Sequence, residues 1–169
     1  MSVKLNKKEF HLARSILQNQ KKNTLNMIAY SHVHMYSFIE RFRMQYPQAD
    51  IIVWNIDTHQ DYKNENLKPD CGNWAGMAIQ DFYVTVKWIS NDLSPYYVRH
   101  PEITSLGTSL EVLKDQQFNG IFLCKSEPWC PPHLDTYFNA MVSTIRNHFD
   151  RTTIQKGITK EREYLKELS

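Results

Sequence analysis

Residues 51–61, IIVWNIDTHQD, constrain the fold most strongly because an apolar run leads directly into side chains that can bind a metal ion. Residues 51–56 are almost all β-branched or aromatic, which predicts a central strand covered on both faces. Asp57, His59 and Asp61 follow at alternate positions, so an extended backbone would place their side chains on one side. Such a set suits a divalent ion such as Mn²⁺. On this motif alone, a polar loop with a solvated histidine is an equal alternative.

Residues 25–56 predict a strand, a helix and a second strand in that order. The helix has apolar residues at helical spacing up to Tyr46, and Pro47 ends it. A βαβ unit of this kind builds a parallel sheet, and ligands gather at the carboxyl ends of its strands. We therefore expect His34, after the first strand, and Asp57, after the second, to lie at the same edge of the sheet. We expect His32 to be packed or hydrogen-bonded to the backbone rather than to bind the metal.

Three further segments have interpretable patterns. Asn6 and Glu9 resemble a capping box that starts a helix reaching about residue 19. Residues 120–124 predict a buried strand, and a helix follows the two prolines at 131 and 132. Residues 78–92 fit either a helix or a strand, and we favour the helix. The expected fold is a three-layer αβα domain with a short, mainly parallel sheet.

Composition limits the organisation of the chain and its partners. A chain of 169 residues that is 41% hydrophobic and 22% charged suits one soluble domain, which we place at residues 1–150, with a charged helical tail at 151–169. The tail could dock on another subunit, so a homo-oligomer stays open, but a solvated helix is preferred. A net charge of +2 does not suggest a nucleic-acid partner. With neither a signal-like N-terminus nor a long apolar stretch, we expect a cytoplasmic protein without a membrane partner.

The spacing of the histidine and aspartate residues resembles that of the ureohydrolase superfamily of arginases and agmatinases, including the peptide arginases. In that superfamily a metal-binding His precedes a D-x-H-x-D cluster by about two dozen residues, and here His34 stands 23 residues before Asp57. Residues 71–77, CGNWAGM, are similar to the arginase stretch Ser-Gly-Asn-Leu-His-Gly. The resemblance implies an arginase-like fold and a Mn²⁺ site formed by His34, Asp57, His59 and Asp61.

The same resemblance implies a reaction in which metal-bound hydroxide attacks a guanidino carbon. Asp61 would also steady the proton of the hydroxide, and Glu127 would face the substrate guanidinium, although a solvated turn residue is the alternative interpretation of Glu127. Asn73 and Trp74 would shape the substrate pocket. Ala75 stands where arginases carry a His, so a peptide-borne arginine is a more attractive substrate than the free amino acid, although a small molecule with a guanidinium group stays open.

The sequence departs from the superfamily in one respect that bears on the metal centre. Ureohydrolases carry a second D-x-D-type cluster, and this sequence contains no D-x-D. We therefore expect at most one tightly bound divalent ion per chain. Two alternatives remain open: a catalytically degenerate arginase-like protein that binds a partner, and an unrelated metallohydrolase acting on an amide or phosphoester.

Overall fold

The computed structural model describes residues 5–62, 68–97, 99–126 and 132–155. Contacts between residues divide the chain into two units, each described by itself below. Unit 1 comprises Met1–Ser31 and Glu111–Ser169, and unit 2 comprises His32–Leu110. Within the described part of the chain, no helix is long and apolar enough to cross a membrane.

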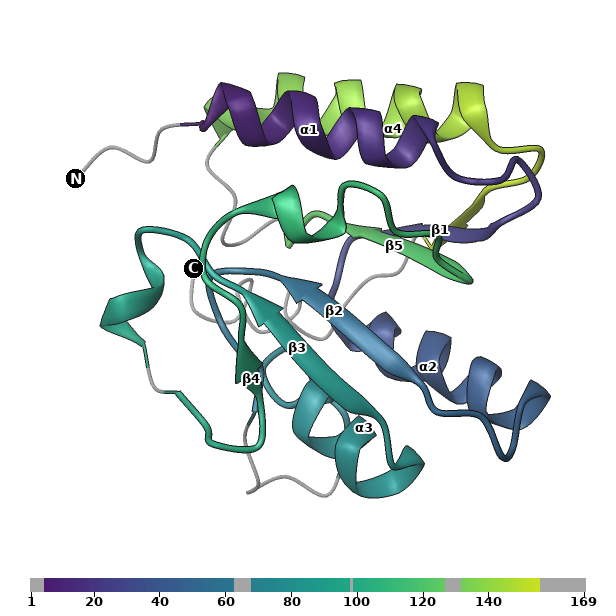
Figure 1. The fold of residues 1–169 in the computed structure, drawn as a ribbon, viewed down its shortest axis with the longest axis vertical. Coiled ribbons are helices and arrows are strands. Elements are labelled where there is room, and N and C mark those ends of the chain that lie inside the picture. Colours follow the sequence, from purple (N-terminus) through teal and green to yellow (C-terminus); the bar gives the residue numbers. More distant parts are fainter. Residues whose placement is uncertain (1–4, 63–67, 98, 127–131, 156–169) are drawn as a thin grey trace, which may run out of the picture. The chain divides into compact units, whose positions relative to one another are not determined.

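Unit 1 contains a parallel sheet with two helices packed on it (Figure 1). Its elements are α1 (Lys7–Gln18), β1 (Leu25–Ala29), β5 (Gly120–Cys124), the short 3₁₀ helix η3 (Pro132–Leu134), α4 (Asp135–His148) and β6 (Thr153–Gln155). The strand order is β5–β1–β6, and both pairs are parallel. Leu17 of α1, Ile28 of β1 and Ile145 of α4 share one buried cluster, which joins both helices to the sheet.

Unit 2 has a second parallel sheet and carries the candidate site. Its elements are α2 (Val33–Gln45), β2 (Ile52–Ile56), α3 (Trp74–Phe82), β3 (Thr85–Ile89), the 3₁₀ helix η1 (Ser94–Tyr96) and β4 (Thr104–Ser105); the 3₁₀ helix η2 (Leu110–Leu113) begins at its last residue. The strand order is β2–β3–β4, with both pairs parallel. Ile39 of α2, Ala78 of α3, Val53 of β2 and Val86 of β3 belong to one buried cluster, so both helices pack against the sheet through it.

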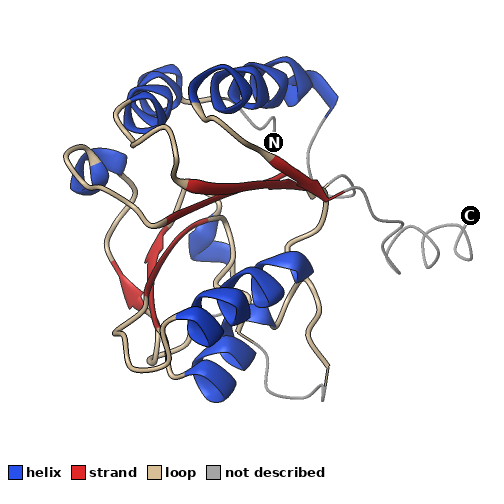
Figure 2. Cartoon of the chain, turned by 90° about the vertical axis from the view of Figure 1, so that its right-hand side faces the viewer, coloured by secondary structure: helices blue, strands red, loops and turns tan. Residues whose placement is uncertain are grey.

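The predicted α/β class with short parallel sheets is confirmed, because helices alternate with parallel strands in the chain (Figure 2). The expected pairing within the βαβ unit is wrong, since β1 and β2 belong to different sheets. β2 is also not a central strand: it stands at the end of the order β2–β3–β4, and Ile52 and Ile56 are 49% and 55% exposed. Its period-two burial pattern is that of a strand buried on one face.

Element boundaries show where local chemistry decided the outcome. Asn6 caps α1 by accepting a hydrogen bond from the Glu9 backbone N–H, as predicted. Residues 78–92, which fitted either a helix or a strand, contain both: α3 ends at Phe82 and β3 begins at Thr85. Tyr83 separates them with a left-handed φ of 53°. In the predicted tail, Thr153–Gln155 form a strand paired with β1 rather than a helix, and residues 156–169 lie outside the described residues.

Candidate metal centre

Asp57 follows directly after β2 and is held by the neighbouring strand β3. Its backbone N–H donates to the Ile89 carbonyl oxygen at 3.2 Å. Its carbonyl oxygen accepts a hydrogen bond from the indole N–H of Trp88 at 2.8 Å. Trp88 is 1% exposed and belongs to the core of unit 2, so the sheet fixes the position from which the Asp57 side chain extends.

Asp61 reaches the same place through a bent backbone. Residues 57–59 form bends, and Asp61 has a φ of 52°, so the extended conformation predicted for D-x-H-x-D is wrong. The Asp61 carbonyl oxygen accepts from the Ala75 N–H at 3.2 Å, and its Oδ2 accepts from the Trp74 indole N–H at 2.7 Å. The first turn of α3 therefore holds Asp61 by both its backbone and its side chain.

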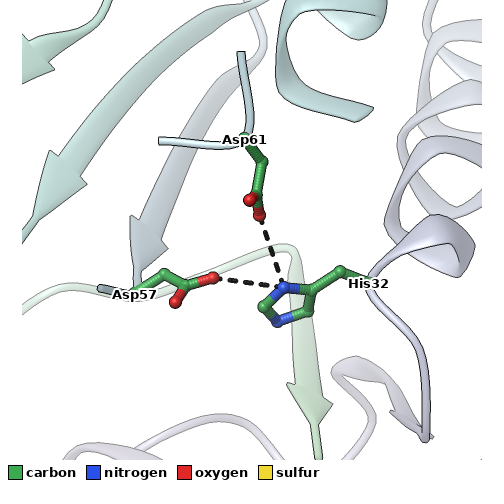
Figure 3. A group of neighbouring side chains, drawn as sticks. All are labelled: His32, Asp57 and Asp61. Carbon is green, nitrogen blue, oxygen red and sulfur yellow. Dashed lines mark ion pairs between the residues drawn. The ribbon is translucent and has the colours of Figure 1, made fainter. Parts of the chain in front are cut away.

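His32 completes the group from the residue just before α2. Its Nδ1 lies 3.1 Å from Asp57 Oδ2 and 3.4 Å from Asp61 Oδ2, so the imidazole faces both carboxylates (Figure 3). One potential ligand atom from each of the three residues lies within 4.8 Å of the others. We call His32, Asp57 and Asp61 the HDD cluster. All three residues belong to unit 2.

The spacing in the HDD cluster suits a shared divalent ion. Metal bonds of about 2.0–2.2 Å place neighbouring ligand atoms ~3.0 Å apart in an octahedron and ~3.4 Å apart in a tetrahedron. The two distances from His32 Nδ1 fall in this range. They also suit an Nδ1–H that donates to the carboxylates without a metal. Three protein ligands leave coordination positions for water and substrate, the pattern of catalytic metal sites.

Exposure decreases across the HDD cluster. The His32 side chain is 22% exposed, Asp57 is 16% exposed and Asp61 is 7% exposed. Asp61 is therefore the most buried member of the group and His32 the most exposed.

The two aspartates differ in their acidity. Burial is the largest influence on Asp57 and raises its pKa, but the hydrogen bond and charge of His32 and the contacts with His59 outweigh it, so the pKa of Asp57 lies below its ordinary value. For Asp61, burial and the negative charge of Asp57 outweigh the hydrogen bonds from His32 and Trp74, so its pKa is raised. A buried carboxylate beside another is stabilised by a cation, which a divalent ion would provide.

The histidines occupy different places from those predicted. His32 was expected to be packed or bonded to backbone, but it carries the contacts to both aspartates. Val33 already begins α2, so His34 lies in the first helical turn rather than on an extended segment, and it is not a member of the HDD cluster. His59 Nδ1 lies 3.9 Å from Asp57 Oδ1, and its side chain is 40% exposed. The proposed ligand roles of His34 and His59 stay predictions.

The predicted substrate residues are buried. Asn73 is 0% exposed; its side chain accepts from the Asp70 N–H and donates to the Lys68 carbonyl oxygen, which ties together the loop before α3. Trp74 is 1% exposed and directs its N–H at Asp61. Contact of either residue with a substrate stays a prediction. Glu127, the predicted partner of a guanidinium, lies outside the described residues.

Comparisons with known proteins gave no match: no family model, no curated protein and no solved structure matches this chain.

Proposed function

We propose that the chain is a metal-dependent hydrolase that binds a divalent ion through His32, Asp57 and Asp61. The observation that carries the proposal is the convergence of one imidazole nitrogen and two carboxylate oxygens within 4.8 Å at the carboxyl end of β2. In parallel α/β sheets, ligands collect at this end of the strands. The mixed nitrogen and oxygen set is compatible with Mn²⁺, the ion that the resemblance to ureohydrolases implies.

The three residues of the HDD cluster would contribute different charges to the binding of a metal ion. Asp57 and Asp61 supply two negative charges to balance a dication, and a neutral His32 supplies a nitrogen ligand whose ring is already directed by the aspartates. When bound, the metal ion would act as a Lewis acid and lower the pKa of a water molecule. His59 lies partly exposed beside Asp57, with its Nδ1 3.9 Å from Asp57 Oδ1.

For the substrate we propose a guanidino compound, with a peptide-borne arginine preferred. This part rests on the resemblance of D-x-H-x-D and of residues 71–77 to ureohydrolases. An arginine side chain can enter a site without its α-amino group being recognised, and Ala75 is fully buried in α3, where it offers no polar group to a free amino acid.

The proposed function is tested by metal binding together with urea release. After removal of metals with a chelator, we expect isothermal titration with Mn²⁺ to show one tight site per chain, because the cluster contains three ligands and a second ion would have to share Asp57. Urea release is then measured for arginine, agmatine and an arginine-containing peptide, and the peptide should react fastest. Mn²⁺ binding without urea release from any of them would favour the degenerate binding protein or another hydrolase. Absence of divalent-ion binding contradicts the proposal.

Replacing His32 with Ala should lower the affinity for Mn²⁺ by at least about tenfold, because a direct ligand matters no less than the outer-shell partners whose loss typically costs 10- to 100-fold. His34→Ala is the matched control, two residues away in the same segment. Titration of both variants distinguishes the ligand that the structure indicates from the one that the sequence pattern indicates. A loss in His34→Ala with wild-type affinity in His32→Ala would reverse the assignment.

A further inference from the structure

The buried indole of Trp74 has a charged side chain as its hydrogen-bond acceptor. Its N–H donates to a carboxylate oxygen, Asp61 Oδ2, at 2.7 Å, and both residues are buried. Trp88, the other fully buried tryptophan of unit 2, donates instead to a backbone carbonyl, that of Asp57. A core tryptophan needs only some acceptor for its N–H, and a neutral carbonyl suffices. Burying a carboxylate in order to supply that acceptor is costly.

We propose that Trp74 is a positioning residue for the metal site: its indole N–H fixes the Asp61 carboxylate in the orientation that binds the ion. The inference rests on the proposed function and adds to it a residue that acts on the metal site through Asp61. Outer-shell groups that hydrogen-bond a ligand carboxylate set its orientation and commonly change metal affinity 10- to 100-fold.

The atoms involved support a positioning role. The oxygen that accepts from Trp74 is the one that lies 3.4 Å from His32 Nδ1, so the indole acts on the part of Asp61 that faces the rest of the cluster. An indole only donates, and a carboxylate has about four lone-pair directions, so Asp61 keeps the capacity to bind an ion.

The backbone of Asp61 is held in place as well as its side chain. With a φ of 52°, Asp61 occupies a conformation that non-glycine residues adopt rarely, and its carbonyl is held by the N–H of Ala75. Trp74 and Ala75 are the first two residues of α3, so consecutive residues hold the carboxylate and the carbonyl. The positive end of the α3 dipole also favours a negative charge here. The site is thereby preorganised before a metal ion arrives.

The first test is metal affinity in variants at position 74. Trp74→Phe removes the N–H, and we expect the affinity for Mn²⁺ to fall 10- to 100-fold. Phe is smaller than Trp and could disturb the core, so a second variant keeps the shape of the ring. It carries, only at position 74, a tryptophan analogue in which sulfur replaces the indole N–H. This variant should show a similar loss of affinity. Val86→Ala is the core-packing control: it removes buried volume from the same cluster but leaves the indole bonds to Asp57 and Asp61 in place, and should change affinity at most about threefold.

The second test is a spectroscopic signature that a purely structural tryptophan would lack. In protein labelled with ¹⁵N at the indoles, the Trp74 cross-peak is identified by its absence in Trp74→Phe. Titration with diamagnetic Zn²⁺ should shift this cross-peak by more than those of Trp54 and Trp88, because its acceptor becomes a metal ligand.

The outcomes separate the inference from the proposed function. Wild-type protein that binds no divalent ion overturns both. Wild-type protein that binds Mn²⁺ with the same affinity as the two position-74 variants overturns the positioning role and leaves the metal site standing. An equal loss in Val86→Ala and Trp74→Phe assigns the effect to core packing and also overturns the positioning role.

Discussion

Asp61→Asn is expected to lower the affinity for Mn²⁺ by more than about 100-fold while leaving the metal-free protein equally or more stable. The substitution removes a charged ligand, a greater loss than that of an outer-shell partner. It also removes the carboxyl group whose pKa is raised by burial and by Asp57, so its ionised form opposes folding at neutral pH. Asn tolerates the left-handed φ of 52° and can still accept from Trp74. Titration calorimetry and urea unfolding of the metal-free protein measure the two effects.

Asp50→Asn is the control for this prediction. Asp50 is exposed in the loop before β2 and is outside the HDD cluster, so the same chemical change should leave Mn²⁺ affinity unaltered. Wild-type affinity in Asp61→Asn would remove Asp61 from the ligand set. A marked loss of stability without a change in affinity would assign Asp61 a structural role instead.

Trp88→Ala should be among the most destabilising single substitutions in unit 2. Trp88 is 1% exposed in the core beneath α2 and α3, and truncating a buried Trp typically costs about 3–5 kcal/mol. The change also leaves the Asp57 carbonyl without its indole donor. Urea unfolding followed by circular dichroism measures the difference in the free energy of unfolding.

The matched control is Trp54→Ala in the adjacent strand β2. Trp54 is only partly buried, and Lys87 lies over its ring at 4.7 Å. Its loss should cost less than half as much, because part of its surface already contacts water. Similar losses in the two variants would contradict the burial that distinguishes these residues.

The sequence pattern correctly predicted that the two aspartates of the candidate site lie together, but it predicted the wrong backbone conformation between them. An apolar strand followed by D-x-H-x-D does place Asp57 and Asp61 together. They meet across a bend with a left-handed residue, whereas the prediction assumed an extended chain. The hydrogen bonds that stabilise this bend come from Trp74 and Ala75, which are distant in sequence, so no local pattern reveals it.

The choice between His32 and His34 depended on a helix boundary. An extended segment would place His32 and His34, two residues apart, on the same face, so the strand pattern gave no basis for choosing between them. Because α2 begins at Val33, His32 occupies its N-cap position and His34 its first turn. Helix starts are the least certain feature of a sequence pattern, and His32 has no side-chain capping bond that would mark this one.

The alternation typical of a strand is present at residues 85–89, but the helical spacing in the same window led us to favour a helix. Val86 and Trp88 alternate with less buried residues as a strand requires, yet the apolar spacing of α3 continues into the same window. The helix ends because Tyr83 adopts a left-handed conformation, and a non-glycine residue gives no warning of this. Similarly, the apolar content of β2 suggested burial on both faces, but its place at the end of the strand order leaves Ile52 and Ile56 exposed.

The most direct test of the central claim is the anomalous scattering of Mn²⁺ in crystals grown with the ion. The account predicts one strong peak in unit 2, about 2.0–2.2 Å from His32 Nδ1 and from one oxygen of each of Asp57 and Asp61. Crystals that show no peak there, with the imidazole of His32 still hydrogen-bonded directly to the two carboxylates at saturating Mn²⁺, would show that the HDD cluster is a structural network and would contradict the account.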